Sequence, residues 1–155
     1  MITIGIGEIN VCKVPEALVT YALGSCVGVC LYDSTMKIAG LAHVMLPTST
    51  PAQTTNRYAD IAIVNLVKEM EKKGASKFRM TAKIAGGAKM FESASNNNIG
   101  HIGERNVEAV KAMLKELNIR IIASDTGANY GRTVYFYPDD GRLEIKTCKG
   151  VSKTI

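Results

Sequence analysis

The sequence contains no tryptophan, only three phenylalanines and only two histidines among its 155 residues, and aromatic residues make up 6% of the chain. It also lacks an unbroken apolar run of the roughly 18 residues that a membrane span needs. The first 13 residues have no basic segment at their start, and Glu8 and Asn10 interrupt their apolar pattern, which is unlike a signal peptide. These absences predict a cytoplasmic protein with no direct membrane insertion.

Cysteine pairs of the kind that bind zinc or form disulfide frameworks are also missing. The four cysteines are Cys12, Cys26, Cys30 and Cys148, and none forms a Cys-x-x-Cys pair. The two histidines, His43 and His101, do not cluster with them as the ligands of a structural zinc site do. A chain of this length buries about two-thirds of its unfolded surface, so it needs neither disulfides nor a metal to fold. We therefore expect no metal and no cofactor.

The composition is that of a globular protein, with 46% hydrophobic and 21% charged residues, and neither a linker nor a repeat divides it. We therefore expect a single domain spanning residues 1–155. Nineteen basic and 14 acidic residues give a net charge of +5, which favours an acidic partner. However, the basic residues are spread along the chain without interleaved aromatics, which argues against nucleic-acid binding.

Alternating apolar residues predict strands in the first third of the chain. Residues 2–6 alternate, and residues 27–33 and 38–46 are two β-rich runs separated by the short polar segment 34–37. The two runs therefore read as a hairpin, and a Thr/Ser/Pro loop follows over residues 47–55.

Two helices are predicted from apolar residues at helical spacing. The first covers residues 59–70, with Thr55 or Asn56 as N-cap and Gly74 just beyond its end. The second has an apolar stripe from Val107 to Leu117.

Further strands are expected around these helices. They cover residues 77–84, 119–124, 134–136 and 143–145, the last two joined by a Pro-Asp-Asp-Gly turn. The polar tail, 149–155, is expected to fray. Many strands and only two main helices predict an α+β fold in which layered β-sheets form a sandwich.

Cys26 is the first candidate for chemistry. It follows Gly24 and Ser25 at the start of a predicted strand, and the glycine permits a tight backbone. Such a turn exposes a thiol and aims backbone N–H groups at a bound carbonyl oxygen. The alternative is that Cys26 is a small buried hydrophobe, the usual fate of a free cysteine.

His43 strengthens the functional interpretation. With a four-residue loop, Asp33 faces Ile38 across the hairpin, so Gly28 faces His43 and Cys26 faces Met45. Cys26 and His43 then share one face of the sheet as diagonal neighbours. A histidine next to a cysteine in this way is a base that can activate the thiol. The other histidine, His101, is expected to lie on the surface.

Two glycine-containing motifs are less informative. Asp125-Thr126-Gly127-Ala128 matches the aspartic-protease motif, but two sizeable helices do not suit those nearly all-β enzymes, so a turn after a strand is the better interpretation. Gly86-Gly87 lacks the pattern of a phosphate-binding loop and predicts a tight turn or a close backbone approach to a ligand.

Taken together, several segments resemble the CheD family of bacterial chemoreceptor glutamine deamidases. The segments that carry this resemblance are Thr20–Cys30, Gly40–Pro47, Lys83–Ala88, Met90-Phe91, Ile102–Asn106 and Asp125–Gly127. One departure is Ala128, where the family pattern has a second glycine; if the position requires a positive φ, Ala128 is strained.

The resemblance implies a protein-glutamine glutaminase that hydrolyses glutamine side chains on methyl-accepting chemotaxis receptors to glutamate. It implies that Cys26 is the nucleophile, His43 the catalytic histidine, and Thr20 the residue that orients the histidine. It also implies binding to the CheC phosphatase and a fold like that of the cytotoxic necrotizing factor deamidases. Together with the turn at Gly24 and Ser25, it predicts an oxyanion and substrate-binding site there.

Two other functions remain open from the sequence. One is a non-catalytic adaptor that binds receptors and CheC through the same groove. The other is a general cysteine peptidase, because the residues do not distinguish attack on a side-chain amide from attack on a backbone amide.

Overall fold

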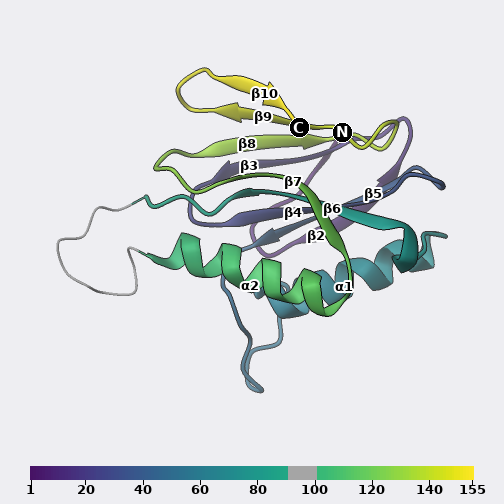
Figure 1. The fold of residues 1–155 in the computed structure, drawn as a ribbon, viewed down its shortest axis with the longest axis horizontal. Helices are drawn as coiled ribbons and strands as arrows, with labels where there is room; N and C mark the ends of the chain where they lie inside the picture. Colours follow the sequence, from purple (N-terminus) through teal and green to yellow (C-terminus); the bar gives the residue numbers. More distant parts are fainter. Residues whose placement is uncertain (91–100) are drawn as a thin grey trace.

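The computed structural model describes residues 1–90 and 101–155, and within them two five-stranded sheets stack on each other with two helices beneath (Figure 1). Phe91, which belongs to one of the segments that carry the family resemblance, lies outside the described residues. The architecture is α+β with two mixed sheets, as predicted.

The first sheet contains both ends of the chain. Its strands are ordered β1 (Ile2–Thr3), β3 (Leu18–Leu23), β8 (Arg132–Phe136), β9 (Leu143–Thr147) and β10 (Ser152–Thr154). Strands β1 and β3 are parallel, and the other neighbours are antiparallel.

The second sheet lies between the first sheet and the helices (Figure 1). Its strands are ordered β2 (Ile9–Lys13), β5 (Ile38–Val44), β4 (Val27–Asp33), β6 (Met80–Gly86) and β7 (Arg120–Thr126). Strands β6 and β7 are parallel, and α2 (Ile102–Glu116) lies between them in the chain.

The predicted hairpin and its register are confirmed. Asp33 pairs with Ile38 and Gly28 pairs with His43 in the β4–β5 ladder. Asp33 is fully buried at the turn, where its carboxylate accepts hydrogen bonds from the backbone N–H groups of Thr35 and Met36 and from the side chain of Arg79. These bonds hold the turn end of the hairpin rigidly.

Two apolar cores lie on the two faces of this hairpin. Val27, Val29 and Leu31 pack toward the helices, whereas Cys30 and Leu41 pack between the two sheets. A strand buried on both faces explains why residues 27–33 form a nearly continuous apolar run. The face between the sheets is the one that carries His43.

Helix α1 (Ala59–Lys72) buries the six apolar residues that the periodicity predicts. Its predicted N-cap is wrong: the helix begins after Tyr58 without a side-chain cap, and Asn56 instead accepts a hydrogen bond from Asn65 Nδ2 at 2.8 Å. Gly74 follows the end with φ +108°, as predicted. Among the described residues, no helix is long and apolar enough to cross a membrane.

Two predicted strands are shorter than expected. At the N-terminus only Ile2–Thr3 is extended, because Gly7 (φ +74°) turns the chain and the Glu8 side chain caps the Gly5 N–H. In the segment 77–84 the first three residues form a 3-10 helix, η1 (Lys77–Arg79), and Phe78 is 97% exposed rather than half-buried.

The C-terminal tail does not fray as expected. Strand β10 pairs with β9, and Lys153 Nζ lies 2.7 Å from Asp125 Oδ1. Lys83 Nζ donates to the carbonyls of Gly141 and Ile155, both at 2.8 Å. Backbone pairing and charged partners distant in sequence therefore order a segment whose own composition is polar.

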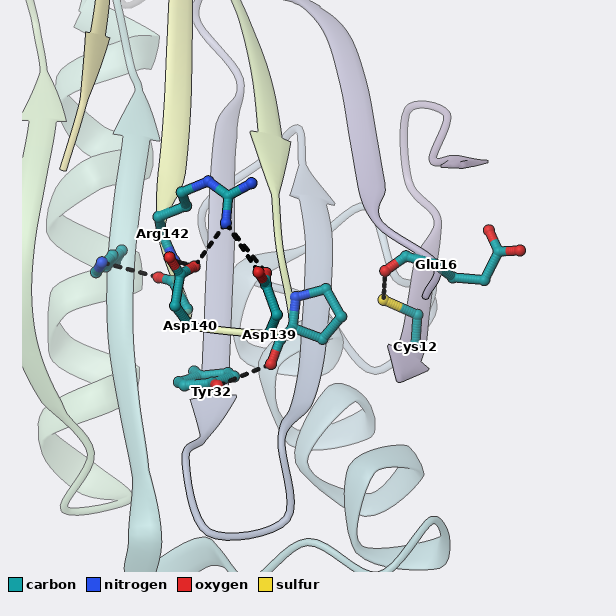
Figure 2. A network of polar contacts seen from close by, with 9 residues as sticks. Cys12, Glu16, Tyr32, Asp139, Asp140 and Arg142 are labelled. Carbon is teal, nitrogen blue, oxygen red and sulfur yellow. Dashed lines mark hydrogen bonds and ion pairs between the residues drawn. The ribbon is translucent and has the colours of Figure 1, made fainter. Parts of the chain in front are cut away.

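The turn between β8 and β9 docks on the hairpin at the end remote from Cys26. The Tyr32 hydroxyl donates to the Pro138 carbonyl at 2.8 Å. Arg142 lies between Asp139 and Asp140 (Figure 2). Gly141 (φ +76°) passes directly under the Tyr32 ring, where a side chain would not fit. This end of the sandwich is closed by side chains, which leaves the opposite end for the site.

Candidate functional site

Cys26 lies in the short connection between β3 and β4. A bulge at the end of β3, where Ala22 has φ +57°, shifts the register between Thr20 and Leu23. The extra residue lets Thr20 and Leu23 both face the other sheet before the chain turns at Gly24. The Cys26 side chain is half-buried and packs against the core between the sheets.

The backbone of Gly86, Gly87 and Ala88 holds this connection in place. Gly87 N–H donates to the Cys26 carbonyl and Ala88 N–H donates to the Gly24 carbonyl, both at 2.8 Å. A Cβ on Gly86 would lie 2.3 Å from the Cys26 carbonyl oxygen. The predicted close approach at Gly86-Gly87 is therefore confirmed, but its partner is the chain itself rather than a ligand.

His43 is buried between the sheets opposite Gly28, as the register predicts. Its Nδ1 lies 2.7 Å from Thr20 Oγ1, and the Thr20 hydroxyl is also 2.6 Å from the Ile4 carbonyl. A hydroxyl has one proton, and the Ile4 carbonyl can only accept, so Thr20 donates to Ile4 and accepts from His43 Nδ1–H. The proton of the neutral ring therefore sits on Nδ1.

The other ring nitrogen, Nε2, carries a free lone pair. It is buried and has no hydrogen-bond partner among the described residues. Cys26 packs against the core between the sheets, on the face of the hairpin that carries the ring. No hydrogen bond joins its thiol to Nε2.

Burial sets the charge state of both groups. It lowers the pKa of His43 to about 4 and raises the pKa of the Cys26 thiol above its usual value. At neutral pH the thiol and the imidazole are therefore both neutral, rather than a thiolate and an imidazolium. The imidazole is ready to accept a proton at Nε2.

Asn106 joins the site from α2. It is fully buried, and its Nδ2 donates to the carbonyls of Ser25, at 3.0 Å, and Met45, at 2.9 Å. Asn106 ends one of the segments that carry the family resemblance, but no role was predicted for it from the sequence. Its position four residues before Val110 places it on the apolar stripe of the predicted helix, and a polar residue on that stripe is the pattern that could have identified it.

Asp125 forms ion pairs with two basic side chains. Its carboxylate lies 3.0 Å from Arg132 Nε and 2.7 Å from Lys153 Nζ. Burial alone would raise its pKa, but hydrogen bonds from Lys153 and Arg132 hold the pKa below its usual range. The group stays ionised at neutral pH, unlike a carboxylate that shares a proton, so it does not suit the aspartic-protease interpretation. The predicted turn is correct only in part, because Asp125 and Thr126 still belong to β7 and the chain turns at Gly127 and Ala128.

The residues after Asp125 adopt left-handed backbone conformations. Gly127 has φ +84° and Ala128 has φ +59°. The position of Ala128 therefore does require a positive φ, which costs an alanine about 1–2 kcal/mol relative to its usual conformation. The Ala128 carbonyl accepts from Lys89 N–H at 2.8 Å, which helps to hold the loop.

The remaining candidate residues lie apart from this site. His101 is exposed and directly precedes α2, as expected. Cys12 and Cys30 are buried, and burial raises the pKa of Cys12 to about 11, while Cys148 is exposed. Within residues 1–90 and 101–155, no group of three His, Cys, Asp or Glu side chains could hold a metal.

Comparison with known proteins agrees with the resemblance. The family model described as "CheD chemotactic sensory transduction" matches residues 45–147. The "Probable chemoreceptor glutamine deamidase CheD" of Caldanaerobacter subterraneus subsp. tengcongensis is 49% identical over 95% of this chain and 93% of its own. The "Chemoreceptor glutamine deamidase CheD" of Halalkalibacterium halodurans is 47% identical over 100% of this chain and 98% of its own. This chain therefore belongs to the CheD family.

Proposed function

We propose that this protein is a protein-glutamine glutaminase that converts glutamine side chains of chemotaxis receptors to glutamate and ammonia. The names of its relatives supply the substrate and the reaction. The observation that supports the chemistry is the hydrogen bond from His43 Nδ1 to Thr20, because it leaves an unprotonated Nε2 on the face shared with Cys26.

In the first half of the reaction, His43 Nε2 takes the proton of the Cys26 thiol as sulfur attacks the glutamine Cδ. The carbonyl oxygen becomes an oxyanion. When the tetrahedral intermediate collapses, the imidazolium returns its proton to the leaving nitrogen, and the products are ammonia and a thioester on Cys26.

In the second half, His43 takes a proton from water as the water oxygen attacks the thioester. The C–S bond breaks, sulfur regains a proton from the imidazolium, and glutamate is released. Thr20 acts throughout by accepting from Nδ1–H, which keeps Nε2 as the nitrogen that exchanges protons. One water is consumed for each ammonia, and no cofactor is required.

The backbone N–H of Cys26 is the proposed oxyanion donor. Among the described residues, neither this N–H nor that of Ser25 has a backbone acceptor. Gly24 lets the chain turn before them, so these donors are free to bind the oxygen that becomes negative.

Three exposed apolar side chains lie on segments next to the Cys26 connection and suit a protein substrate. Met90 packs over Gly24, since a Cβ there would lie 3.0 Å from Met90 Cγ, and Met90 lines a hollow with Tyr21. The Asn106 amide donates to the carbonyls of both Ser25 and Met45, which places the backbone of Met45 near the Cys26 connection. Met45, Met90 and Tyr21 are 39%, 44% and 51% exposed. A receptor segment that presents a glutamine would dock on these three residues, and the net charge of +5 favours an acidic segment.

The proposal extends to the whole chain as one domain and to a fold like that of the cytotoxic necrotizing factor deamidases. Binding to the CheC phosphatase, which the family resemblance implies, stays a prediction.

The adaptor alternative would use the same surface without chemistry, but an adaptor needs no unprotonated histidine nitrogen on the same face as a cysteine. A general peptidase is not favoured by the names of the relatives.

The experiment that tests the proposal compares ammonia release from purified receptor cytoplasmic fragments by the wild-type protein and by Cys26→Ala. Cys30→Ala is the matched control, because Cys30 is buried in β4, four residues after Cys26, and packs between the sheets. We expect release by the wild type and by Cys30→Ala, and none by Cys26→Ala, with receptor binding retained in all three. Receptor binding without release by the wild type would favour the adaptor.

A further inference from the structure

Asn106 makes two hydrogen bonds that the proposed reaction steps do not use. Its side-chain NH2 bridges the carbonyls of Ser25 and Met45, which belong to the two segments that flank the site. Both carbonyls can only accept, so this orientation of the amide is fixed by its partners.

The Asn106 side chain does not serve stability alone. Its Oδ1 is buried and has no hydrogen-bond partner among the described residues. A buried polar atom without a hydrogen-bond partner lowers the stability of a fold, so its presence needs an explanation such as a function of the side chain. The side chain points to the connection that carries Cys26, which indicates where that role is.

The bond to Ser25 also sets the direction of the next N–H. The Ser25–Cys26 peptide is trans, so its carbonyl and the Cys26 N–H point in opposite directions. Because Asn106 holds the carbonyl toward α2, the N–H of Cys26 points away from α2, toward the side of the hairpin that carries His43. That N–H is the oxyanion donor of the proposed function.

We propose that Asn106 is a positioning residue that orients the Ser25–Cys26 peptide so that the Cys26 N–H binds the oxyanion formed during acyl transfer. The inference rests on the proposed function for its natural substrate, but not for its test, since any acyl transfer to Cys26 forms the same oxyanion. The bond to Met45 fixes the end of β5 relative to this peptide and keeps the site from widening.

Two reagents separate this role from a merely structural one. p-Nitrophenyl acetate acylates a thiol through a tetrahedral oxyanion, whereas iodoacetamide alkylates it by direct displacement, which forms no oxyanion. Both reactions are followed on the Cys26 peptide by mass spectrometry, and the exposed Cys148 of the same molecule is the internal reference.

We expect Asn106→Leu to lower acylation of Cys26 about 100-fold, the loss typical of one oxyanion donor, and to leave its alkylation rate unchanged. Asn106→Asp keeps the shape of the side chain but replaces the donor with an oxygen, so it should show the same loss of acylation. It replaces Asn106→Leu in the experiment if circular dichroism shows that the leucine variant does not fold. Asn65→Leu is the control, because Asn65 also donates from a helix to a nearby segment, Asn56, but away from Cys26.

Equal losses in both reactions would mean that Asn106 only maintains the loop, and no loss in either would mean that it orients nothing; both results overturn the inference. If the wild type shows the contrast with Asn106→Leu but releases no ammonia from receptors, the positioning role stands and the proposed function fails. If receptor deamidation by Asn106→Leu equals that of the wild type, the positioning role fails and the proposed function stands.

Discussion

Thr20 and His43 belong to different sheets, and the 2.7 Å hydrogen bond between Thr20 Oγ1 and His43 Nδ1 crosses the interior of the sandwich. The Ile4 carbonyl fixes the direction of that bond by accepting the only proton of the Thr20 hydroxyl. One buried hydroxyl therefore selects the ring nitrogen of His43 that is free to take a proton.

Replacing Thr20 tests this selection. Thr20→Val leaves the Nδ1–H of His43 without its acceptor, which costs about 1–3 kcal/mol. If the ring turns or changes tautomer to avoid that cost, kcat should fall by about 5- to 160-fold. Thr20→Ser retains the hydroxyl and should recover most of the rate. Steady-state ammonia release measures both variants, and equal rates for valine and serine would show that the hydroxyl has no part in the reaction.

The charge state of the free pair predicts the pH dependence of the reaction. Since burial lowers the pKa of His43 to about 4 and raises that of Cys26, kcat/KM should be flat near neutral pH and fall to half near pH 4. A preformed thiolate–imidazolium pair would instead keep Cys26 alkylation fast in acid. We expect the iodoacetamide rate at Cys26 to rise continuously with pH above 8, and a plateau between pH 5 and about 8 would contradict the neutral pair.

The same burial predicts a stability effect with a definite sign. His43 has a pKa of about 4 in the folded state and about 6.5 when unfolded. Between about pH 4 and 6.5 the unfolded state therefore binds a proton on this ring that the folded state does not. The free energy of unfolding should therefore decrease by about 3 kcal/mol as pH falls from 7 to 4 because of this residue. Urea titrations of His43→Gln should lack this part of the decrease, whereas His101→Gln, changed at an exposed histidine, should retain it. If the free energy of unfolding of His43→Gln falls with pH as steeply as that of the wild type, His43 is not responsible for the decrease.

The proposed docking of a receptor segment on Met45 and Met90 is tested by adding charged side chains there. Met45→Glu and Met90→Glu add a negative charge where we expect an acidic receptor segment, so KM for receptor fragments should rise with little change in kcat. Phe78→Glu is the control, because Phe78 is 97% exposed but lies in η1, next to the turn end of the hairpin. If the three variants have the same KM, the receptor docks elsewhere.

The local pattern of the sequence predicted the centre of the fold well. The hairpin register followed from a four-residue loop and a two-residue side-chain period, which together fix which residues share a face. The six buried positions of α1 followed from helical spacing. Strand β3 was not predicted because it has no clear alternation: Leu18, Val19 and Thr20 are all buried in succession. Strand β2 was not predicted either, since its alternation ends after three residues, at the buried Cys12.

What escaped prediction depends on contacts distant in sequence. The tail is ordered by β9, Lys83 and Asp125, and Phe78 is exposed because η1 interrupts the alternation. Within the site, the shared face of Cys26 and His43 was predictable because both lie on one hairpin. The role of Asn106 was not, since its bonds to Ser25 and Met45 span 81 and 61 residues.

The most direct test of the central claim is peptide mass spectrometry of receptor cytoplasmic fragments incubated with the wild-type protein, Cys26→Ala or His43→Gln. We predict that the wild type produces the mass change of glutamine-to-glutamate conversion at a small set of sites, with the receptor backbone uncleaved. The two variants should leave those glutamines unchanged. Conversion by Cys26→Ala at the wild-type rate, or backbone cleavage in place of conversion, would contradict the account.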